Sequence, residues 1–218
     1  MGAGDRSAQF DGSTLGGHSH MCAFFNSLDE QHRVLRPFIK DGFDRGEKAL
    51  HIVDPQLRAE HLKRLGEAGI DVERTMASGQ LDVRLWQEAY LRGDRFDQDA
   101  MLALIEEQLQ SGAAAGSRGI RLIAHMEWSL LDKPGVDDLL EYETRLNYVF
   151  PKYDHPGTIC TYDLVKFSSS MAMDIMRTHP AVIIGGVLQE NPFFVPPDEF
   201  LLEIRERRSV RTSARMAR

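Results

Sequence analysis

Short runs of apolar residues alternate with longer amphipathic stretches along most of the chain. The amphipathic stretches carry apolar residues three and four positions apart, as at Leu35, Phe38 and Ile39, which is the spacing of one helix face. The short runs have the length of buried strands and lie at residues 20–25, 48–53, 81–85, 120–126, 158–162 and 181–184. Strands of this kind separated by amphipathic helices indicate a parallel sheet with helices on both faces. We therefore expect a three-layer α/β domain.

The two ends of the chain differ in composition from the middle. Residues 1–16 are rich in Gly and Ser without periodicity, which predicts a flexible N-terminal segment before a domain at 17–207. Six Arg and one Glu follow from Arg205 onward, so residues 208–218 form a basic C-terminal tail. Such charge blocks usually stay unfolded, although this tail also suits contact with nucleic acid, an acidic surface or the domain itself. Because the net charge is −7, the domain itself is acidic, which disfavours nucleic-acid binding by it.

Composition narrows the class of protein. With 42% hydrophobic and 27% charged residues, the chain has the make-up of a globular protein, not of a disordered or coiled-coil one. No apolar run approaches the roughly 20 residues of a membrane span, and the first residues lack the apolar core of a signal peptide. Two cysteines cannot build a disulfide framework. We therefore expect a soluble, cytoplasmic protein that does not associate with membranes.

The junction after the first strand argues against the commonest α/β chemistry. A nucleotide-binding protein of this class carries GxxxxGK[ST] at that place, whereas this chain has CAFFNSLDE, with no Gly and no Lys. The sequence also lacks a GxGxxG dinucleotide fingerprint, a GxSxG nucleophile elbow, and the HExxH and CxxC metal motifs. We therefore expect neither a catalytic site nor a bound cofactor.

Residues at the carboxyl ends of the expected strands are the best candidates for a binding site, because ligands of open α/β sheets bind beyond that edge. These candidates are Asn26, Glu127, Trp128, Tyr162 and Asp163. Aromatic walls with a few amide and acidic groups suit a pocket for a small molecule. Some have a structural alternative, since Trp128 also suits core packing and Asp163 also suits a cap. Glu127 favours a role in the site, because an unpaired carboxylate is costly to bury.

A second constellation lies at the start of the first strand. His18, His20 and Cys22 alternate, so in an extended strand their side chains project from one face. A transition metal held there would need a fourth ligand from a neighbouring strand, such as His51, His125 or Cys160. The spacing equally suits core residues, or a Cys22 nucleophile beside a histidine, and we expect no metal. His179 is interpreted as a loop or cap residue, not as a proton-transfer group.

Several separated segments resemble one known family. They are HMCAFF from His20, FIKDGFDRGEKALHIVD from Phe38, EW at Glu127, CTYDLVKF from Cys160 and THPAVIIGGVLQENPFFVPP from Thr178. Together they are similar to the MEDS domain, a sensory domain named after methanogens, methylotrophs and the regulator of dichloromethane dehalogenase. The resemblance covers about residues 17–207. One difference lies before the first strand, where family members carry Gly-Asp-His and this chain has Gly17-His18-Ser19-His20.

The resemblance implies a RecA/KaiC-like core that has lost its Walker A loop, in agreement with the missing phosphate-binding motif. It also implies a sensory or regulatory role, because members are thought to sense small hydrocarbon derivatives. Members occur fused to DNA-binding, histidine-kinase or anti-sigma domains, whereas this chain shows no recognisable effector domain. No catalytic residues carry over from the family.

These observations predict a stand-alone sensory module that binds a small, hydrocarbon-derived ligand. It would signal through a regulatory protein partner in transcriptional or sigma-factor-type regulation. Three alternatives stay open: a degenerate nucleotide-binding protein related to ATPases, a structural oligomerisation module, and a metal-binding protein that uses His18, His20 and Cys22. RecA-like domains often self-associate, so the sequence is also compatible with a homo-oligomer.

Overall fold

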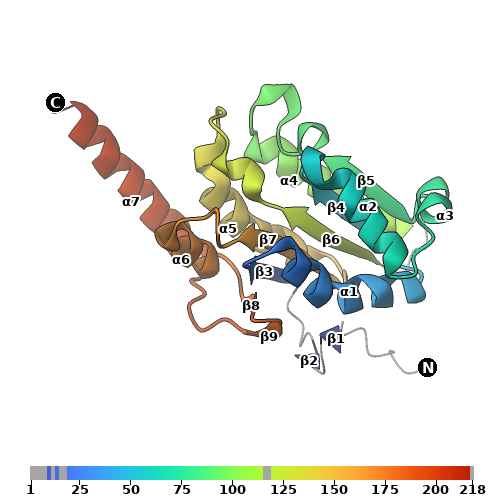
Figure 1. Cartoon of the computed structure of the whole chain (residues 1–218). Coiled ribbons are helices and arrows are strands. Elements are labelled where there is room, and N and C mark those ends of the chain that lie inside the picture. Colours follow the sequence, from blue (N-terminus) through green and yellow to red (C-terminus); the bar gives the residue numbers. More distant parts are fainter. Residues whose placement is uncertain (1–8, 11–12, 15–18, 115–118, 217–218) are drawn as a thin grey trace.

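A seven-stranded sheet forms the centre of the computed structural model, which describes residues 9–10, 13–14, 19–114 and 119–216 (Figure 1). The strand order is β5-β4-β6-β7-β3-β8-β9. The bounds are β3 (His20–Phe25), β4 (Lys48–Val53), β5 (Leu81–Leu85), β6 (Ile120–His125), β7 (Gly157–Asp163), β8 (Ala181–Ile184) and β9 (Val187–Glu190). All neighbouring strands run parallel except β8 and β9. The six expected strands are present, and the α/β fold is confirmed.

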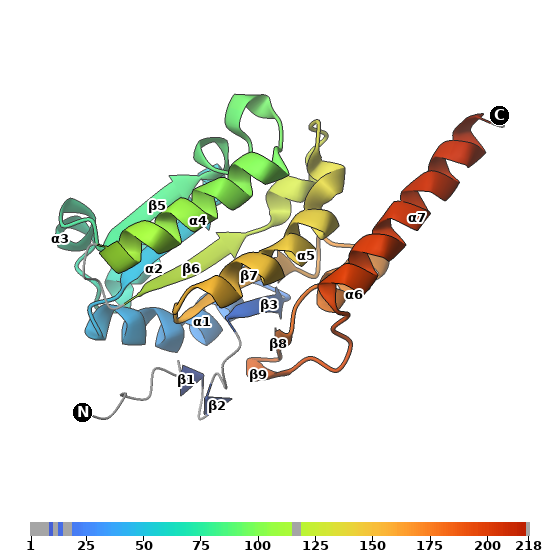
Figure 2. The ribbon, with the colours of Figure 1, turned by 180° about the vertical axis from the view of Figure 1, so that it is seen from behind.

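Helices cover both faces of this sheet. They are α1 (Leu28–Asp44), α2 (Arg58–Glu67), α3 (Val72–Ala77), α4 (Gln98–Ala114), α5 (Leu139–Val149), α6 (Ser169–Arg177) and α7 (Pro197–Met216). The helices α1 and α2 lie in front of the sheet in Figure 1, and α4 and α5 lie in front of it when the molecule is seen from behind (Figure 2). The sheet is therefore the middle of three layers, as the sequence predicts.

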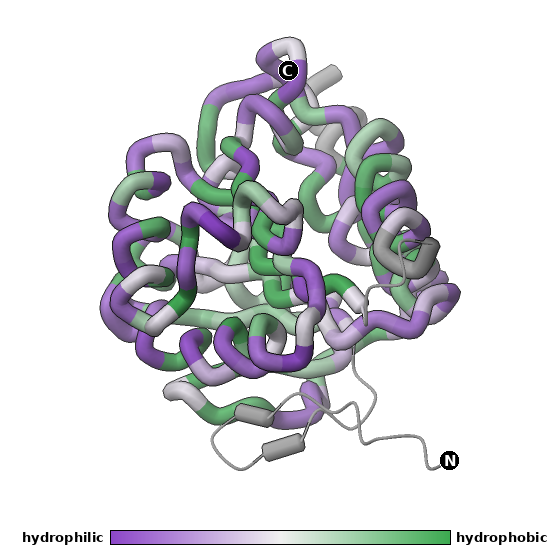
Figure 3. The backbone as a smooth tube through the Cα atoms, turned by 90° about the vertical axis from the view of Figure 1, so that its right-hand side faces the viewer, coloured by the Kyte–Doolittle hydropathy of each residue, from purple (hydrophilic) through white to green (hydrophobic). Residues whose placement is uncertain are grey.

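Each face of the sheet has its own hydrophobic core, because successive strand residues point to opposite sides. In β3, Cys22 and Phe24 belong to the core beneath α4 and α5, whereas Met21, Ala23 and Phe25 belong to the core beneath α1 and α2. All six residues of β3 are buried, and so are all six of β6. Figure 3 shows the consequence: hydrophobic segments gather at the centre, and the surrounding helices alternate hydrophobic and hydrophilic residues.

The edge of the sheet beyond β8 differs from the expectation. The sequence predicts 181–184 as the last strand, whereas the chain turns back and adds β9 antiparallel to β8. Gly185 and Gly186 make this turn with φ of +59° and +81°, in the left-handed region that favours Gly. Only Leu188 is buried in β9, so this strand has little hydrophobic pattern to reveal it.

The basic C-terminal tail is helical, and the expectation that it stays unfolded is wrong. The helix α7 continues through it to Met216 and projects away from the sheet (Figures 1 and 2). Arg208 explains part of this order, because its guanidinium lies 2.7 Å from Asp138 and 2.6 Å from Glu141. The acidic surface around α5 therefore neutralises part of the basic segment and supports the helix.

The N-terminal segment 1–16 lies mostly outside the described residues. Its described parts are two short strands, β1 (Gln9–Phe10) and β2 (Ser13–Thr14), which pair antiparallel. Within the described part of the chain, none of the helices combines the length and the apolar character that crossing a membrane requires.

The junction between β3 and α1 is closed by the chain's own side chains. Ser27 caps α1, with its Oγ accepting a hydrogen bond from the backbone N–H of Glu30 at 3.2 Å. The carboxylate of Glu30 reaches back and accepts hydrogen bonds from the backbone N–H of Asn26 at 2.8 Å and from its side-chain amide at 3.3 Å. In nucleotide-binding proteins the N–H groups at this position point at phosphate. Here the Glu30 carboxylate accepts the N–H of Asn26, and the Ser27 hydroxyl accepts that of Glu30.

Candidate functional site

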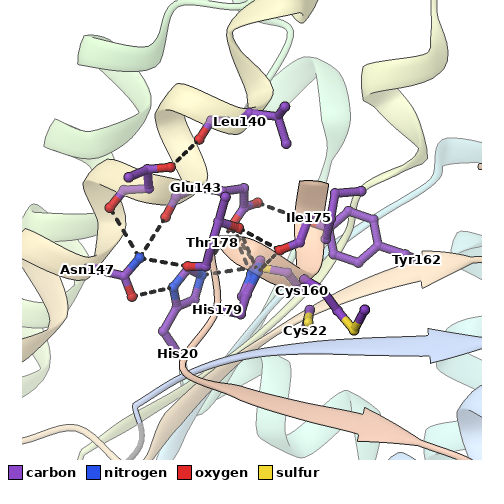
Figure 4. A network of polar contacts seen from close by, with 12 residues as sticks. His20, Cys22, Leu140, Glu143, Asn147, Cys160, Tyr162, Ile175, Thr178 and His179 are labelled. Atoms are coloured by element: carbon purple, nitrogen blue, oxygen red, sulfur yellow. Dashed lines mark hydrogen bonds and ion pairs between the residues drawn. The ribbon is translucent and has the colours of Figure 1, made fainter. Parts of the chain in front are cut away.

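A group of buried polar side chains lies between the sheet and α5 (Figure 4). Its four central members are His20, Glu143, Cys160 and His179, each no more than 1% exposed. His20 begins β3, Cys160 lies within β7, Glu143 belongs to α5, and His179 lies between α6 and β8. Each offers one nitrogen, oxygen or sulfur atom, and these atoms all lie within 4.8 Å of one another. We call these four side chains the buried polar cluster.

The periodicities of strand and helix bring the cluster together. Cys22 and Cys160 are register partners in neighbouring strands, and His20 shares their face because alternate strand residues point the same way. On the opposing helix, Glu143 takes one position of the core-facing stripe. The other positions of that stripe are Leu139, Tyr142 and Leu146. A carboxylate therefore projects into the core at a place where the helix pattern calls for an apolar residue.

The carboxylate of Glu143 is the centre of the cluster. Its Oε2 lies 3.1 Å from Nε2 of His20 and 3.1 Å from Nε2 of His179. The thiol of Cys160 lies 3.6 Å from the same oxygen and 3.8 Å from Nε2 of His20. The other carboxylate oxygen, Oε1, accepts a hydrogen bond from the hydroxyl of Tyr162 at 3.1 Å. One carboxylate thus contacts two imidazoles, a thiol and a phenol.

Hydrogen bonds on the outer side of each imidazole fix its orientation. Nδ1 of His20 lies 3.1 Å from Oδ1 of Asn147. The amide nitrogen of Asn147 donates to the backbone carbonyls of Glu143, Thr144 and Thr178, which places its oxygen toward His20. Nδ1 of His179 lies 2.9 Å from the carbonyl oxygen of Ile175, which only accepts. Both imidazoles therefore carry a proton on Nδ1 and turn Nε2 toward the carboxylate.

Burial and mutual contacts shift the pKa values in the cluster. Burial would raise the pKa of Glu143, but the adjacent imidazoles of His179 and His20 outweigh it and lower it to about 2. Burial and the adjacent His179 lower the pKa of His20 to about 4. Burial also opposes charge on His179, yet the sulfurs of Cys22 and Cys160 and the carboxylate raise its pKa well above the usual value. Burial and Glu143 raise the pKa of Cys160 to about 12, so this thiol is protonated at neutral pH.

A second polar group, which we call the histidine group, lies on the opposite face of the sheet beneath α1 and α2. Nδ1 of His51 lies 2.9 Å from Nε2 of His61, and Nε2 of His125 lies 2.9 Å from the amide nitrogen of Gln31. His32 completes the group, with its ring 5.7 Å from that of His61. Burial first, and neighbouring imidazoles second, lower the pKa of His51 and the pKa of His125 to about 3. These two histidines are therefore neutral at neutral pH.

A cavity of about 630 Å³ lies between α5, α6 and α7, and we call it the α5–α7 cavity. Its apolar lining residues are Val136, Leu139, Leu140, Met171, Ile204 and Val210. Ser129 also lines it and belongs to the short helical turn at Glu127–Leu130 that follows β6. Charged residues line the rest of the cavity: Asp137, Asp174, Glu206, Arg207 and Arg208. The volume and the combination of apolar and polar groups match those of small-molecule pockets.

The structure does not gather the five predicted ligand-binding residues in one place. Glu127 and Asp163 meet at the carboxyl edge, where the carboxylate of Glu127 accepts a hydrogen bond from the backbone N–H of Asp163 at 3.1 Å. Tyr162 points to the buried polar cluster instead. Trp128 is fully buried against Tyr90, at 4.6 Å between ring centroids. The fifth residue, at position 26, is exposed and bonded within its own turn. A ligand-binding role for these five residues stays a prediction.

The alternative metal set is only partly assembled. His18 lies outside the described residues, and Cys22 directs its thiol to the carbonyl of Ala181 at 3.9 Å. Of the proposed fourth ligands, Cys160 does reach His20, whereas the other two, His51 and His125, belong to the histidine group on the far face. Glu143 is not among the residues that the sequence pattern singles out, and His179, expected as a loop or cap residue, does lie between α6 and β8 but points into the cluster. The signal for Glu143 was available, since it is the charged residue within the apolar stripe of α5.

Comparison with known proteins places the chain in a family. Residues 19–180 match the model of the MEDS domain, the methanogen/methylotroph, DcmR sensory domain. The chain belongs to the MEDS family. Over 171 residues this MEDS domain is 25% identical to the transcriptional repressor DcmR of Methylorubrum extorquens (strain DSM 6343 / CIP 106787 / DM4). That match covers 78% of the chain but only 62% of the length of DcmR.

Solved structures show the same fold at low sequence identity. A KaiC-like protein of Pyrococcus horikoshii OT3 matches with a TM-score of 0.54 and 16% identity, over 75% of this chain and 70% of that one. An uncharacterized protein of Pyrococcus horikoshii, solved in complex with an unknown peptide, matches with a TM-score of 0.55 and 14% identity, over 76% of each chain. The KaiC-like, RecA-type fold implied by the sequence resemblance is thereby confirmed for the MEDS domain.

Proposed function

We propose that this MEDS domain binds a small, largely apolar molecule and reports its presence to a protein partner in transcriptional or sigma-factor-type regulation. The α5–α7 cavity carries the proposal, because its apolar side chains suit the carbon skeleton of such a molecule. Membership of a family of sensory domains supports the same role. The cavity borders the turn that carries Glu127 and Trp128, two of the residues that the sequence suggests for ligand binding.

The helix α5 gives this cavity a physical connection to the rest of the domain. Its inner side carries Glu143 of the buried polar cluster, and its outer side contacts α7 through Tyr148, whose hydroxyl donates to Asp198. Arg208 of α7 binds Glu141 of α5. A ligand between these two helices would act on both, and a signal passes only if the ligand binds one arrangement of α5 and α7 better than another.

A regulatory role fits the site better than an enzymatic or nucleotide-binding one. The carboxylate of Glu30 accepts the N–H of Asn26 at the start of α1, where a nucleotide-binding relative would offer that position to phosphate. A fixed negative charge there repels the phosphates of a nucleotide. We therefore propose that the MEDS domain is not an enzyme and that the KaiC-like fold serves sensing.

The test uses a panel of small alcohols, halogenated alkanes and short carboxylates, with ATP and Mg²⁺ as a separate arm. Thermal unfolding would be measured for the wild type, for Leu140→Trp, which places a bulky indole in the α5–α7 cavity, and for Leu202→Trp. The last is a matched control, because Leu202 belongs to α7 but is 57% exposed and does not line the cavity. We expect at least one compound to raise the melting temperature of the wild type and the control but not of Leu140→Trp.

Hydrogen exchange with the same compound should slow in α5 and α7 more than in α1. If no compound of the panel stabilises the wild type, or if Leu140→Trp responds like the control, the proposed cavity is wrong. Stabilisation by ATP and Mg²⁺ alone would favour the nucleotide-binding alternative instead.

A further inference from the structure

We propose that the buried polar cluster is a tetrahedral binding site for a divalent transition-metal ion, with Zn²⁺ as the best match. The ligands are Nε2 of His20, Nε2 of His179, a carboxylate oxygen of Glu143 and the sulfur of Cys160. This site is distinct from the α5–α7 cavity, and the inference does not depend on the function proposed above.

The first argument is that atoms of the types that bind transition metals converge on one buried point. Each imidazole donates its Nδ1 proton to an oxygen outside the cluster. His20 donates to the side-chain carbonyl of Asn147, and His179 donates to the backbone carbonyl of Ile175. Nε2 of each ring lies 3.1 Å from Oε2 of Glu143, so two ring nitrogens and a carboxylate oxygen converge on one point. A divalent cation at that point could bind all three atoms at once.

The second argument is the state of His179. Its Nε2 is fully buried, points into the cluster and has no hydrogen-bond partner among the described residues, although the carboxylate lies close by. A buried polar atom without a partner is rare in a folded protein and requires an explanation. A metal ion placed between the carboxylate and the imidazole would bind Nε2 of His179 directly.

The third argument is size. Zinc lies about 2.0–2.1 Å from nitrogen or oxygen and about 2.3 Å from sulfur, which puts tetrahedral ligand atoms about 3.4 Å (N to O) and about 3.6 Å (N or O to S) apart. The cluster has 3.1 Å between each Nε2 and the carboxylate oxygen, and 3.6 and 3.8 Å from the sulfur of Cys160 to Glu143 and His20. Four of the six pairs of ligand atoms therefore lie close to the tetrahedral spacing, and the other two lie within 4.8 Å.

The surroundings support the same assignment. Metal-bound histidines almost always donate their other ring proton to a carbonyl or carboxylate oxygen, and both histidines already do so. Two imidazoles, a thiolate and a carboxylate favour Zn²⁺ over Mg²⁺ or Ca²⁺, which prefer oxygen ligands. Four protein ligands leave no open position for a substrate. The site is therefore structural or metal-responsive, not catalytic.

The first experiment measures metal in the wild-type chain, purified without an affinity tag and in the absence of chelators. We expect about one zinc ion per chain by elemental analysis, since a closed site of this kind binds tightly. Zinc would then be removed with a chelator and replaced by Co²⁺. A tetrahedral Co²⁺ spectrum with a thiolate-to-metal charge-transfer band is expected. The proposal would be overturned if the purified chain contains no zinc and the Co²⁺ titration gives no such spectrum.

The second experiment compares two cysteines that face the same side of adjacent strands. Cys160→Ser should abolish the charge-transfer band. It should also weaken Zn²⁺ binding by more than roughly 100-fold, which is the most that loss of a residue hydrogen-bonded to a ligand usually costs. Competition with a chromophoric chelator measures this affinity. Cys22→Ser is the comparison variant: Cys22 is equally buried and in register but is not one of the four ligands, so this variant should keep the charge-transfer band and lose far less affinity. Equal loss in the two variants, or an unchanged spectrum in Cys160→Ser, would overturn the ligand assignment. Asn147→Ala tests positioning of His20 and should weaken binding roughly 10- to 100-fold.

These outcomes separate the two proposals. A metal-free chain that still responds to small molecules at the α5–α7 cavity overturns only the metal site. A zinc-containing chain that responds to no compound overturns only the proposed sensing function.

Discussion

The stability of the MEDS domain should fall steeply between pH 7 and pH 5, and the histidine group allows this effect to be isolated. His125 is 2% exposed, beneath α1, with Gln31 as its hydrogen-bond partner. Burial, together with the imidazoles of His32 and His51 and the ammonium of Lys166, lowers the pKa of His125 to about 3. A histidine whose native pKa is depressed stabilises the fold above its unfolded pKa. That contribution is lost as the pH falls, because the unfolded chain binds the proton first.

The magnitude follows from the two pKa values. The unfolded side chain titrates near 6.5, so it is almost fully protonated at pH 5 while the native side chain, with a pKa of about 3, is not. Integrating the difference from pH 7 to pH 5 gives a loss of about 2 kcal/mol from this one residue. The result hardly depends on the native pKa, since pH 5 lies well above it.

The assay is urea unfolding at several pH values, followed by the fluorescence of the buried Trp86 and Trp128. His125→Gln removes the titrating ring, and measurement at pH 8 gives the structural cost of the substitution alone. Between pH 7 and pH 5 the wild type should lose about 2 kcal/mol more than the variant, whatever the other groups contribute. Parallel pH profiles for the two proteins would refute the reasoning, because they would mean that His125 takes up its proton in the folded state.

Three further predictions concern stability. Arg121 is 2% exposed and binds Glu47, which is also buried, so Arg121→Leu should cost roughly 3–5 kcal/mol in urea unfolding, and adding Glu47→Leu should restore much of it. Gly135→Ala should lower the free energy of unfolding by at least about 3 kcal/mol, as measured by thermal unfolding. The φ angle of Gly135 is +86°, which alone costs roughly 1–3 kcal/mol, and the added Cβ would also lie 2.2 Å from the carbonyl oxygen of Phe96. Arg208→Ala should cost under roughly 1 kcal/mol yet speed amide exchange along α7, and unchanged exchange there would contradict the role given to its ion pairs.

Most of the fold could be predicted from the sequence, because the strands of this sheet are short apolar runs between helices. The family resemblance was carried by the same segments, and both the fold and the family are confirmed. The failures lie where the hydrophobic pattern is weak. In β9 only Leu188 is buried, and the last turns of α7 hold basic residues whose order depends on distant carboxylates such as Asp138.

The site was harder to predict, because its members come from four separate segments. His20 could be identified as a candidate from its alternation with Cys22, but its partners follow from strand register and from the packing of α5. Local pattern does not state that Glu143 faces β3 and β7. It shows only that a carboxylate interrupts an apolar stripe, which is a signal worth following when the helix is otherwise buried.

The projecting C-terminal helix has a mechanical consequence. With 20 residues α7 is about 30 Å long, so a tilt of about 10° at its first turn would displace its far end by about 5 Å. Movements too small to disturb the packing around the sheet would thus become large at the tip. The same tilt would displace Arg208 by about 3 Å, so it requires the ion pairs of Arg208 with Asp138 and Glu141 to rearrange.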